Sequence, residues 1–225
     1  MSRVRLFSVG FILALSAAAA TGVAPPAPPA PPAPLQTIAL SPVEIPDGLD
    51  DPGPVRALFD SLLAAELARA GFTVVPSHEA GGLWKRFVDS VHGFYSALTG
   101  ELVEEKYRAV MGGTLRELKD RFHADAWLRP EIDVVAVDFE GGKARWDGTD
   151  EGVGSGTSGT VPALSLAVVA LDMDGKEIYT GRGGIQVLRK GFKDVSREKL
   201  FKDAKRNLKA LHLAIDSLLV RRSPS

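Results

Sequence analysis

The sequence predicts an α/β (α+β) fold, in which a mixed β-sheet of about five to six strands is backed by amphipathic helices. Three observations support this prediction. Short segments rich in β-branched residues alternate with longer segments whose apolar residues recur every three or four positions, and glycine-containing turns separate the later strands. The 225 residues suffice for one ordinary domain once a leader and a spacer are set aside.

The domain begins with the pattern of a β-α-β unit. An apolar strand over 37–43 precedes a helix over 54–70, and a second strand follows at 72–75. Pro54 suits the first turn of that helix because its missing amide hydrogen costs nothing there, and Gly71 suits the carboxyl-terminal cap.

Two further amphipathic segments predict a helical hairpin. Apolar residues fall within one arc of a helical projection over 83–98, and a second apolar stripe runs over 103–122. Gly100 separates the two segments. The width of each stripe is that of a helix packed on a core.

The second half of the domain predicts two β-hairpins and a closing helix. Gly141-Gly142 and Asp174-Gly175 supply the hairpin turns. Because the segment 164–171 is apolar on both alternating faces, we expect it in the centre of the sheet. A last apolar stripe over 200–219 predicts a long helix that covers one sheet face. The four hairpin strands cover, in order, 127–139, 143–146, 164–171 and 177–188.

The amino-terminal residues have the pattern of a secretory signal peptide. Arg3 and Arg5 precede an apolar run over 6–15, and the small residues at 17–20 fit signal peptidase. We expect cleavage after Ala20, which removes residues 1–20 and places the protein in the periplasm or outside the cell.

An uncleaved membrane anchor is the alternative interpretation. Residues 6–24 are uncharged and approach the roughly 20 residues that span a bilayer.

Residues 21–35 predict a disordered spacer, because the segment PPAPPAPPAP has few amide donors and no side chain that could form a core. We assign residues 36–220 to a single α/β domain and residues 221–225 to a disordered tail.

Charge and composition exclude several classes of partner and site. The formal net charge is -1, from 27 basic and 28 acidic side chains, and no dense basic cluster occurs, so nucleic acid is not an expected partner. The chain has no cysteine, which excludes disulfides, thiolate nucleophiles and the acylated cysteine of bacterial lipoproteins. Membrane contact is therefore expected only if the amino-terminal segment is uncleaved.

Neither a cofactor nor a bound metal is expected. Gly154, Gly156 and Gly159 match the pattern G-x-G-x-x-G, but a dinucleotide site needs a helix after it, and a strand-like segment follows here. The four histidines are scattered, and no two lie at metal-ligand spacing on one helix. No residue is assigned to catalysis.

Glu66 is the one acidic residue that the pattern places inside an apolar stripe. An unpaired carboxylate would be costly there, so Glu66 needs a partner. Arg69, one turn along, or a residue of a strand is the expected partner, and the alternative is a perturbed acid that lines a cleft. In that alternative the protein is a secreted hydrolase in which Glu66, Asp138 or Glu140 acts as general acid or base.

Aromatic residues of the predicted helical hairpin form the candidate partner surface. They are Trp84, Phe87, Tyr95 and Tyr107. A flat groove beside this hairpin would indicate a binding protein, whereas a deep pocket that gathers the carboxylates would indicate an enzyme.

The order of these features resembles a group of small periplasmic domains. The leader and spacer precede IALSPVEIP, a helix and LARAGFTVVP, and a later segment reads ADAWLRPEIDVV. The closing hairpin, LSLAVVALDMDGKEIYTGRGGIQV, precedes a helix. This arrangement is similar to the α/β domain group of the TolB amino-terminal domain, LpoB and CsgG. The resemblance implies a mixed sheet backed by helices and a non-catalytic, partner-binding role in the bacterial cell envelope.

Our sequence-based hypothesis is an exported binding or assembly module whose partner is another envelope protein. The alternatives are the secreted hydrolase and a signal-anchored envelope scaffold. The sequence departs from the resembled group in lacking an acylated cysteine, membrane-inserting hairpins and a propeller. The oligomeric state and the identity of the partner therefore stay open.

Overall fold

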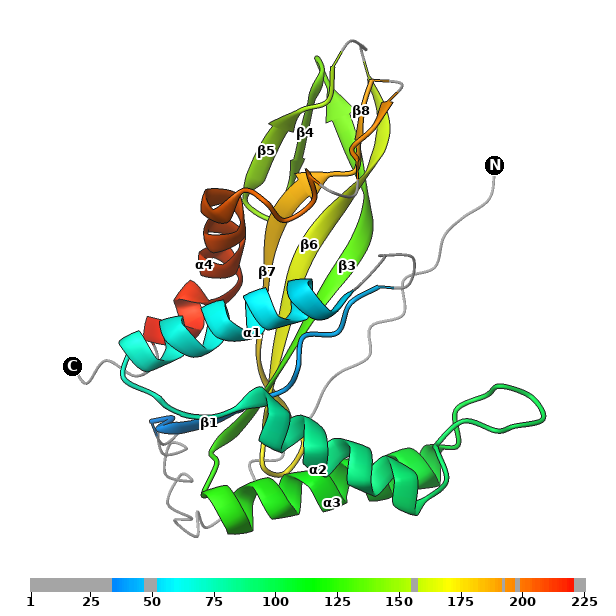
Figure 1. Ribbon diagram of the computed structural model, residues 1–225, viewed down its shortest axis with the longest axis vertical. Coiled ribbons are helices and arrows are strands. Elements are labelled where there is room, and N and C mark those ends of the chain that lie inside the picture. The colour runs from blue at the N-terminus through cyan, green and yellow to red at the C-terminus, as the bar shows by residue number, and fades with distance from the viewer. Residues whose placement is uncertain (1–33, 47–51, 155–157, 192, 197–198, 221–225) are drawn as a thin grey trace, which may run out of the picture. The chain divides into compact units, whose positions relative to one another are not determined.

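The computed structural model of the protein describes residues 34–46, 52–154, 158–191, 193–196 and 199–220. The predicted signal peptide, nearly all of the spacer and the predicted tail lie outside these residues. The described part contains a mixed sheet of seven strands, a separate two-stranded hairpin and four helices (Figure 1). The predicted α/β fold class is confirmed, and the sheet is larger than the five to six strands expected.

The elements follow one another in a simple order along the chain. They are β1 (Thr37–Leu40), α1 (Pro52–Arg69), β2 (Thr73–Val75), α2 (Ser77–Ser90), α3 (Glu104–Phe122), β3 (Ala126–Glu140), β4 (Lys143–Trp146), β5 (Thr149–Gly152), β6 (Ser158–Asp172), β7 (Glu177–Val187), β8 (Arg189–Lys190), β9 (Lys193–Asp194) and α4 (Ala204–Val220). No helix within the described ranges is both long and apolar enough to cross a membrane.

The parallel part of the sheet is built around β1. This strand pairs in parallel with β2 on one side and with β3 on the other. Since α1 connects β1 to β2, the predicted β-α-β unit is present. Beyond Leu40 the chain continues along β3, because the Ser41 N–H donates to the Leu128 carbonyl and the Glu44 N–H donates to the Pro130 carbonyl.

The antiparallel part of the sheet is dominated by β3 and β6. These strands pair along their whole length, from Ala126 opposite Asp172 to Glu140 opposite Ser158. Strand β6 also pairs with β7, which confirms its predicted central position. By contrast, β3 and β4 pair only beside their turn, at Phe139 opposite Ala144. The pattern of Gly154, Gly156 and Gly159 leads into strand β6, so a strand and not a helix follows it, as the sequence predicts.

Helices α1 and α4 cover one face of the sheet and form the largest core with it (Figure 1). Alternating residues of β1 point to opposite faces, so Ile38 and Leu40 join this core while Ala39 joins the other. Fully buried side chains from the two helices and the sheet fill it, including Phe59, Leu63, Leu67, Leu128, Ile132, Leu166, Leu211 and Ile215.

The opposite face carries two smaller cores. Helices α2 and α3 bury Leu83 and Leu118 against Trp127 and Ala39. At the other end of β3 and β6, the β4–β5 hairpin buries Trp146 against the sheet, and the Trp146 Nε1–H donates to the Leu164 carbonyl. The middle of this face carries charged side chains of β3 and β7, including the ion pair between Arg182 and Asp133.

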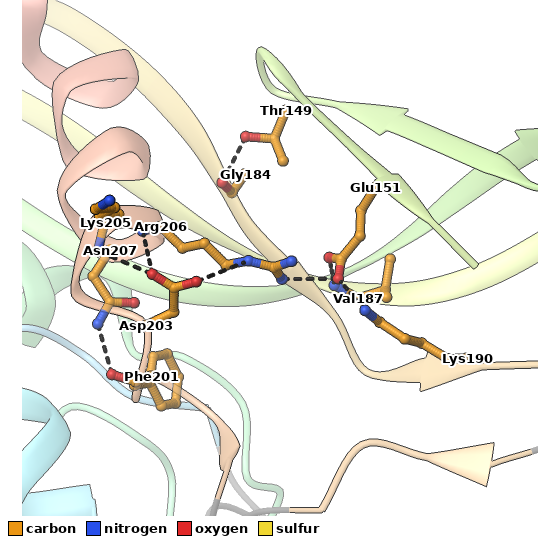
Figure 2. Close-up of polar contacts among 10 residues, drawn as sticks. All are labelled: Thr149, Glu151, Gly184, Val187, Lys190, Phe201, Asp203, Lys205, Arg206 and Asn207. Atoms are coloured by element: carbon orange, nitrogen blue, oxygen red, sulfur yellow. Dashed lines mark hydrogen bonds and ion pairs between the residues drawn. The ribbon is translucent and has the colours of Figure 1, made fainter. Parts of the chain in front are cut away.

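The closing helix begins later than the sequence predicts. Asp203 caps α4 by accepting hydrogen bonds from the Lys205 and Arg206 N–H groups (Figure 2). Phe201, which the apolar stripe placed inside this helix, precedes it with φ of 62°. Asn207 fixes that turn by donating from Nδ2 to the Phe201 carbonyl (Figure 2).

Candidate partner-binding arm

Helices α2 and α3, together with the loop of residues 91–103 between them, form what we call the aromatic arm. The helices pack closely because α3 has no side chain at Gly113. A Cβ atom at this glycine would lie 2.6 Å from the Phe87 ring of α2. Phe87 therefore fills the helix interface and is half-buried there.

The prediction of a continuous helix over 83–98 is wrong. Helix α2 ends at Ser90 and is capped by Val91, after which His92 and Gly93 have φ of 58° and 75°. The Gly93 N–H donates to the Val88 carbonyl and closes the helix end. Gly93 is the residue that could have indicated this stop, because glycine adopts left-handed φ without a Cβ penalty.

The loop tip is ordered by its own backbone. Tyr95 forms an antiparallel bridge with Leu102, and the Ser96 N–H donates to the Glu101 carbonyl at 2.8 Å. The Ser96 hydroxyl oxygen then accepts hydrogen bonds from the N–H groups of Leu98 and Thr99. Lys106 of α3 secures the base of the loop by donating to the Gly93 carbonyl.

This ordered tip presents apolar side chains to solvent. Leu98 is 96% exposed, Tyr95 is 61% exposed and Leu102 is 42% exposed. Scattered single apolar residues on a surface are ordinary, but three on one short ordered loop form a patch.

A chain of contacting aromatic rings connects the tip to the sheet. Phe94 contacts Tyr95 with ring centroids 5.0 Å apart, and it also contacts Tyr107 edge-on at 5.5 Å. Trp84 contacts Phe94 and Tyr107 edge-on, and it lies 5.5 Å from Trp127 of β3. Such pairs add about 0.5–1.5 kcal/mol each beyond their burial, so this chain of rings stiffens the arm.

Three of the four residues predicted as partner surface belong to this chain of rings. Trp84, Tyr95 and Tyr107 are joined through Phe94, whereas Phe87 lies between the helices. The helical spacing over 83–98 predicts that Leu98 faces the core, and Leu102 falls in the connection between the two predicted helices, so neither was expected on the surface. Their exposure depends on the loop geometry, for which only Gly93 and Gly100 gave a signal.

Charged residues on the arm mostly neutralise one another. Ion pairs join Lys85 to Asp89, Arg86 to Glu117 and Arg108 to Glu104. The side chains of these pairs are largely exposed, so each contributes little to stability. Because the charges are balanced, the apolar tip is the feature of the arm that distinguishes it from an ordinary helical surface.

Glu66 is buried in α1 and paired as expected. Its two carboxylate oxygens accept hydrogen bonds from Arg69 Nη1 at 2.5 and 2.6 Å. His212 of α4 adds a second neighbour, with Nε2 at 3.4 Å from Oε2. The side chain thus links α1 to α4.

Glu66→Gln is expected to lower the free energy of unfolding by about 1 kcal/mol, because a charge-assisted hydrogen bond in a buried site is lost. Chemical denaturation at pH 7 measures the change. Glu117→Gln is the matched control, since Glu117 also pairs with an arginine but is more exposed, and we expect at most about 0.5 kcal/mol there. Equal effects would contradict a buried structural role for Glu66.

The carboxylates of the hydrolase alternative do not share one site. Asp138 and Glu140 line an open cleft of ≈ 740 Å³ together with Lys143 and Arg145. Asp138 accepts a hydrogen bond from the Thr160 hydroxyl at 2.9 Å. Glu66 is not among the residues that line this cleft, and its contacts are those with Arg69 and His212. Across the described ranges, no group of three or more His, Asp or Glu side chains could hold a metal ion.

No protein-family model matches the sequence, and no curated protein matches it. Among solved structures, the chain is similar to a hypothetical protein, CT253, from Chlamydia trachomatis. The two share 15% sequence identity with a TM-score of 0.37, over 83% of this chain and 93% of the Chlamydia chain.

Proposed function

We propose that the protein is a non-catalytic, exported module of the cell envelope that binds another envelope protein through the tip of the aromatic arm. The observation that carries this proposal is the apolar patch of Tyr95, Leu98 and Leu102 on an ordered loop. An ordered apolar tip loses little conformational entropy on binding, and aromatic residues are enriched at the centres of protein interfaces.

The predicted leader and spacer support the same role. If residues 6–24 stay in the membrane, Pro25–Pro34 would extend about 3.1 Å per residue as polyproline II and separate the domain from it, whereas cleavage after Ala20 would leave these prolines as an amino-terminal tail. The resemblance to the TolB, LpoB and CsgG domain group also favours partner binding over catalysis. Glu66 lies outside the open cleft of Asp138 and Glu140, so the three carboxylates do not gather in one pocket, which favours a binding protein over the hydrolase alternative.

Site-specific photo-crosslinking in the native cells tests the partner surface. With the crosslinking amino acid at Leu98, we expect one discrete adduct to an envelope protein. Adding Tyr95→Ser and Leu102→Ser should remove most of that adduct, because truncating central apolar contacts costs 1–2 kcal/mol or more each. Val134 is the control position, since it is 52% exposed on β3 and lies outside the arm.

Two outcomes would count against this proposal. Adducts of the same mass from Leu98 and Val134 would show collision instead of docking. Sedimentation of the purified chain with phosphatidylglycerol vesicles, lost on Leu98→Asp, would assign the tip to a lipid surface instead of a protein.

Export has its own measurement. We expect the intact mass of the protein from the periplasm or medium to begin at Thr21, because the small residues before it fit signal peptidase. A mass that retains residues 1–20 in a membrane fraction would replace the secreted protein by the anchored scaffold.

A further inference from the structure

A crevice of ≈ 360 Å³ lies where the arm meets the sheet. Residues that follow β1 form one wall, Trp84 and Gly81 of α2 form another, and Trp127 and Arg129 of β3 lie beside them. Its volume falls at the lower end of the range for small-molecule sites.

One residue that lines the crevice carries a hydrogen-bond donor without an acceptor. Trp127 is 1% exposed, and its buried Nε1–H has no hydrogen-bond partner within the described residues. A buried indole N–H usually has an acceptor, and leaving one unpaired has a free-energy cost. An acceptor supplied by a ligand would remove that cost.

The guanidinium group of Arg129 also has few hydrogen-bond acceptors. Its guanidinium carbon lies 5.6 Å from the Trp84 ring centroid and 5.2 Å from that of Trp127. Only 29% of the side chain is exposed; Glu44 lies 3.5 Å from it, and Glu131 attracts it electrostatically from a greater distance. The two indole rings thus fix the position of the guanidinium group, most of whose N–H groups have no acceptor among the described residues.

Arg56 of α1 supplies a second cation to the crevice. Its Nε–H donates to the Val43 carbonyl at 3.0 Å, and no ion pair involves it among the described residues. Glu44 is 62% exposed at the rim. It also borders, with Arg129 and Glu131, a smaller cavity of ≈ 150 Å³. Two arginines against one carboxylate leave the crevice itself with a formal charge near +1.

The position of the crevice in the fold also favours ligand binding. It lies beyond the carboxyl end of β1, where the chain leaves toward α1 on one face while β2 leads to α2 on the other. In open α/β sheets, ligands bind at such switch points beyond the carboxyl ends of strands. Gly81 lets α2 come close here, because a Cβ atom on it would lie 2.6 Å from the Pro42 ring.

We infer that this crevice binds a small monocarboxylate that carries an apolar or aromatic group. The planar fork of Arg129 matches a carboxylate in two parallel hydrogen bonds, and the charge near +1 suits a monoanion better than a phosphate dianion. The indole rings contact the apolar part, and the Trp127 N–H is an additional donor to the anion. The carboxylate belongs either to a free acid or to the carboxyl terminus of a peptide.

Nuclear magnetic resonance of the three tryptophan indole N–H groups tests this site directly. Trp146 lies in a different core and is already hydrogen-bonded, so it serves as an internal control. Titration with benzoate should shift the Trp127 indole resonance downfield in a saturable manner and leave that of Trp146 in place. Benzamide, a neutral molecule of nearly the same shape, should bind at least about tenfold more weakly, because the charge-assisted hydrogen bonds are lost.

Matched variants distinguish the crevice from general anion binding. Arg129→Gln should weaken benzoate binding about tenfold or more, and Arg129→Lys should have an intermediate effect because it keeps the charge without the fork. Arg108→Gln, on the exposed face of α3, should leave binding unchanged. If either Arg129 variant fails to fold, the comparison of benzoate with benzamide on the wild-type protein still tests the site.

Further probes separate the two sources of the carboxylate. Tighter binding of acetyl-Ala-Ala-Phe than of benzoate, lost in its amide form, would indicate a peptide terminus, and the reverse order would indicate a free acid. Three results would overturn the inference: a Trp127 resonance that does not move in the millimolar range, equal binding of benzamide, or preference for inorganic phosphate.

Discussion

Gly183→Ala is expected to lower the free energy of unfolding by about 3 kcal/mol or more, because the added methyl group would overlap the backbone of α4. Gly183 lies in β7 directly beneath α4. A Cβ atom there would overlap the Ala210 carbonyl oxygen and lie 2.7 Å from its carbon. Both atoms belong to helix backbone, so they cannot move without shifting α4 away from the sheet.

The effect would spread because α4 contributes much of the largest core. Leu211, Ala214 and Ile215 are fully buried against the sheet. Tyr179 of β7 also donates its hydroxyl hydrogen to the Ala214 carbonyl at 2.7 Å. A displaced helix would lose this packing and this hydrogen bond together. Thermal and urea denaturation, followed by circular dichroism, measure the change.

Gly112→Ala in α3 is the matched control for this substitution. A Cβ atom at Gly112 would meet nothing within 4 Å, and alanine stabilises a helix interior by roughly 0.5–1 kcal/mol relative to glycine. The same Gly→Ala substitution should therefore raise the free energy of unfolding at position 112 and lower it at position 183. A stable Gly183→Ala variant would show that α4 does not approach β7 as closely as described.

Much of the fold follows from patterns that are local in the sequence. The three-and-four spacing of Phe59, Leu63 and Leu67 identifies α1, and the same spacing of Leu211, Ile215 and Leu218 identifies α4. The pairing of β3 with β6 does not follow, because residues as far apart as Ala126 and Asp172 meet in it. The hairpin that Gly141-Gly142 predicts is present, but its two strands pair only beside the turn.

The candidate sites also differ in how far local sequence patterns predict them. Trp84 and Tyr107 were found by helical spacing, since they project from helices whose course the sequence determines. The crevice was missed because it joins Arg56 of α1, Trp84 of α2 and Arg129 of β3, which no single period connects. A partial signal existed: Trp127 and Arg129 are two residues apart in a strand, so their side chains share one face.

Glu151→Gln is expected to lower the free energy of unfolding by about 2 kcal/mol at pH 7, because charge-assisted hydrogen bonds to a buried carboxylate are lost. Glu151 is 6% exposed at the side chain. Its Oε1 accepts from Lys190 Nζ at 2.7 Å and from Arg206 Nη1 at 2.8 Å, and its Oε2 accepts from the Val187 N–H at 2.9 Å (Figure 2). These bonds join β5 to β7 and to α4.

The stabilisation by Glu151 should depend on pH, because folding lowers the pKa of its carboxyl group. Burial alone would raise the pKa of Glu151, but the hydrogen bonds from Lys190, the Val187 N–H and Arg206 outweigh burial and lower the pKa below its usual value of 4.5. A carboxylate whose pKa is lowered by folding adds stability above its unfolded-state pKa, and the protein loses that stability as pH falls through the folded-state pKa. The difference between wild type and Glu151→Gln should therefore be full at pH 7 and shrink steadily below pH 4.5.

A surface glutamate separates this effect from a general response to charge. Glu104 pairs with Arg108 one turn along α3, with both side chains about 70% exposed, so Glu104→Gln should change stability by no more than about 0.5 kcal/mol. A double-mutant cycle of Glu151→Gln with Arg206→Gln should then show coupling, because each substitution removes the same ion pair. Additive effects, or a Glu151→Gln deficit that grows on acidification, would mean that Glu151 does not hold β5 and α4 together.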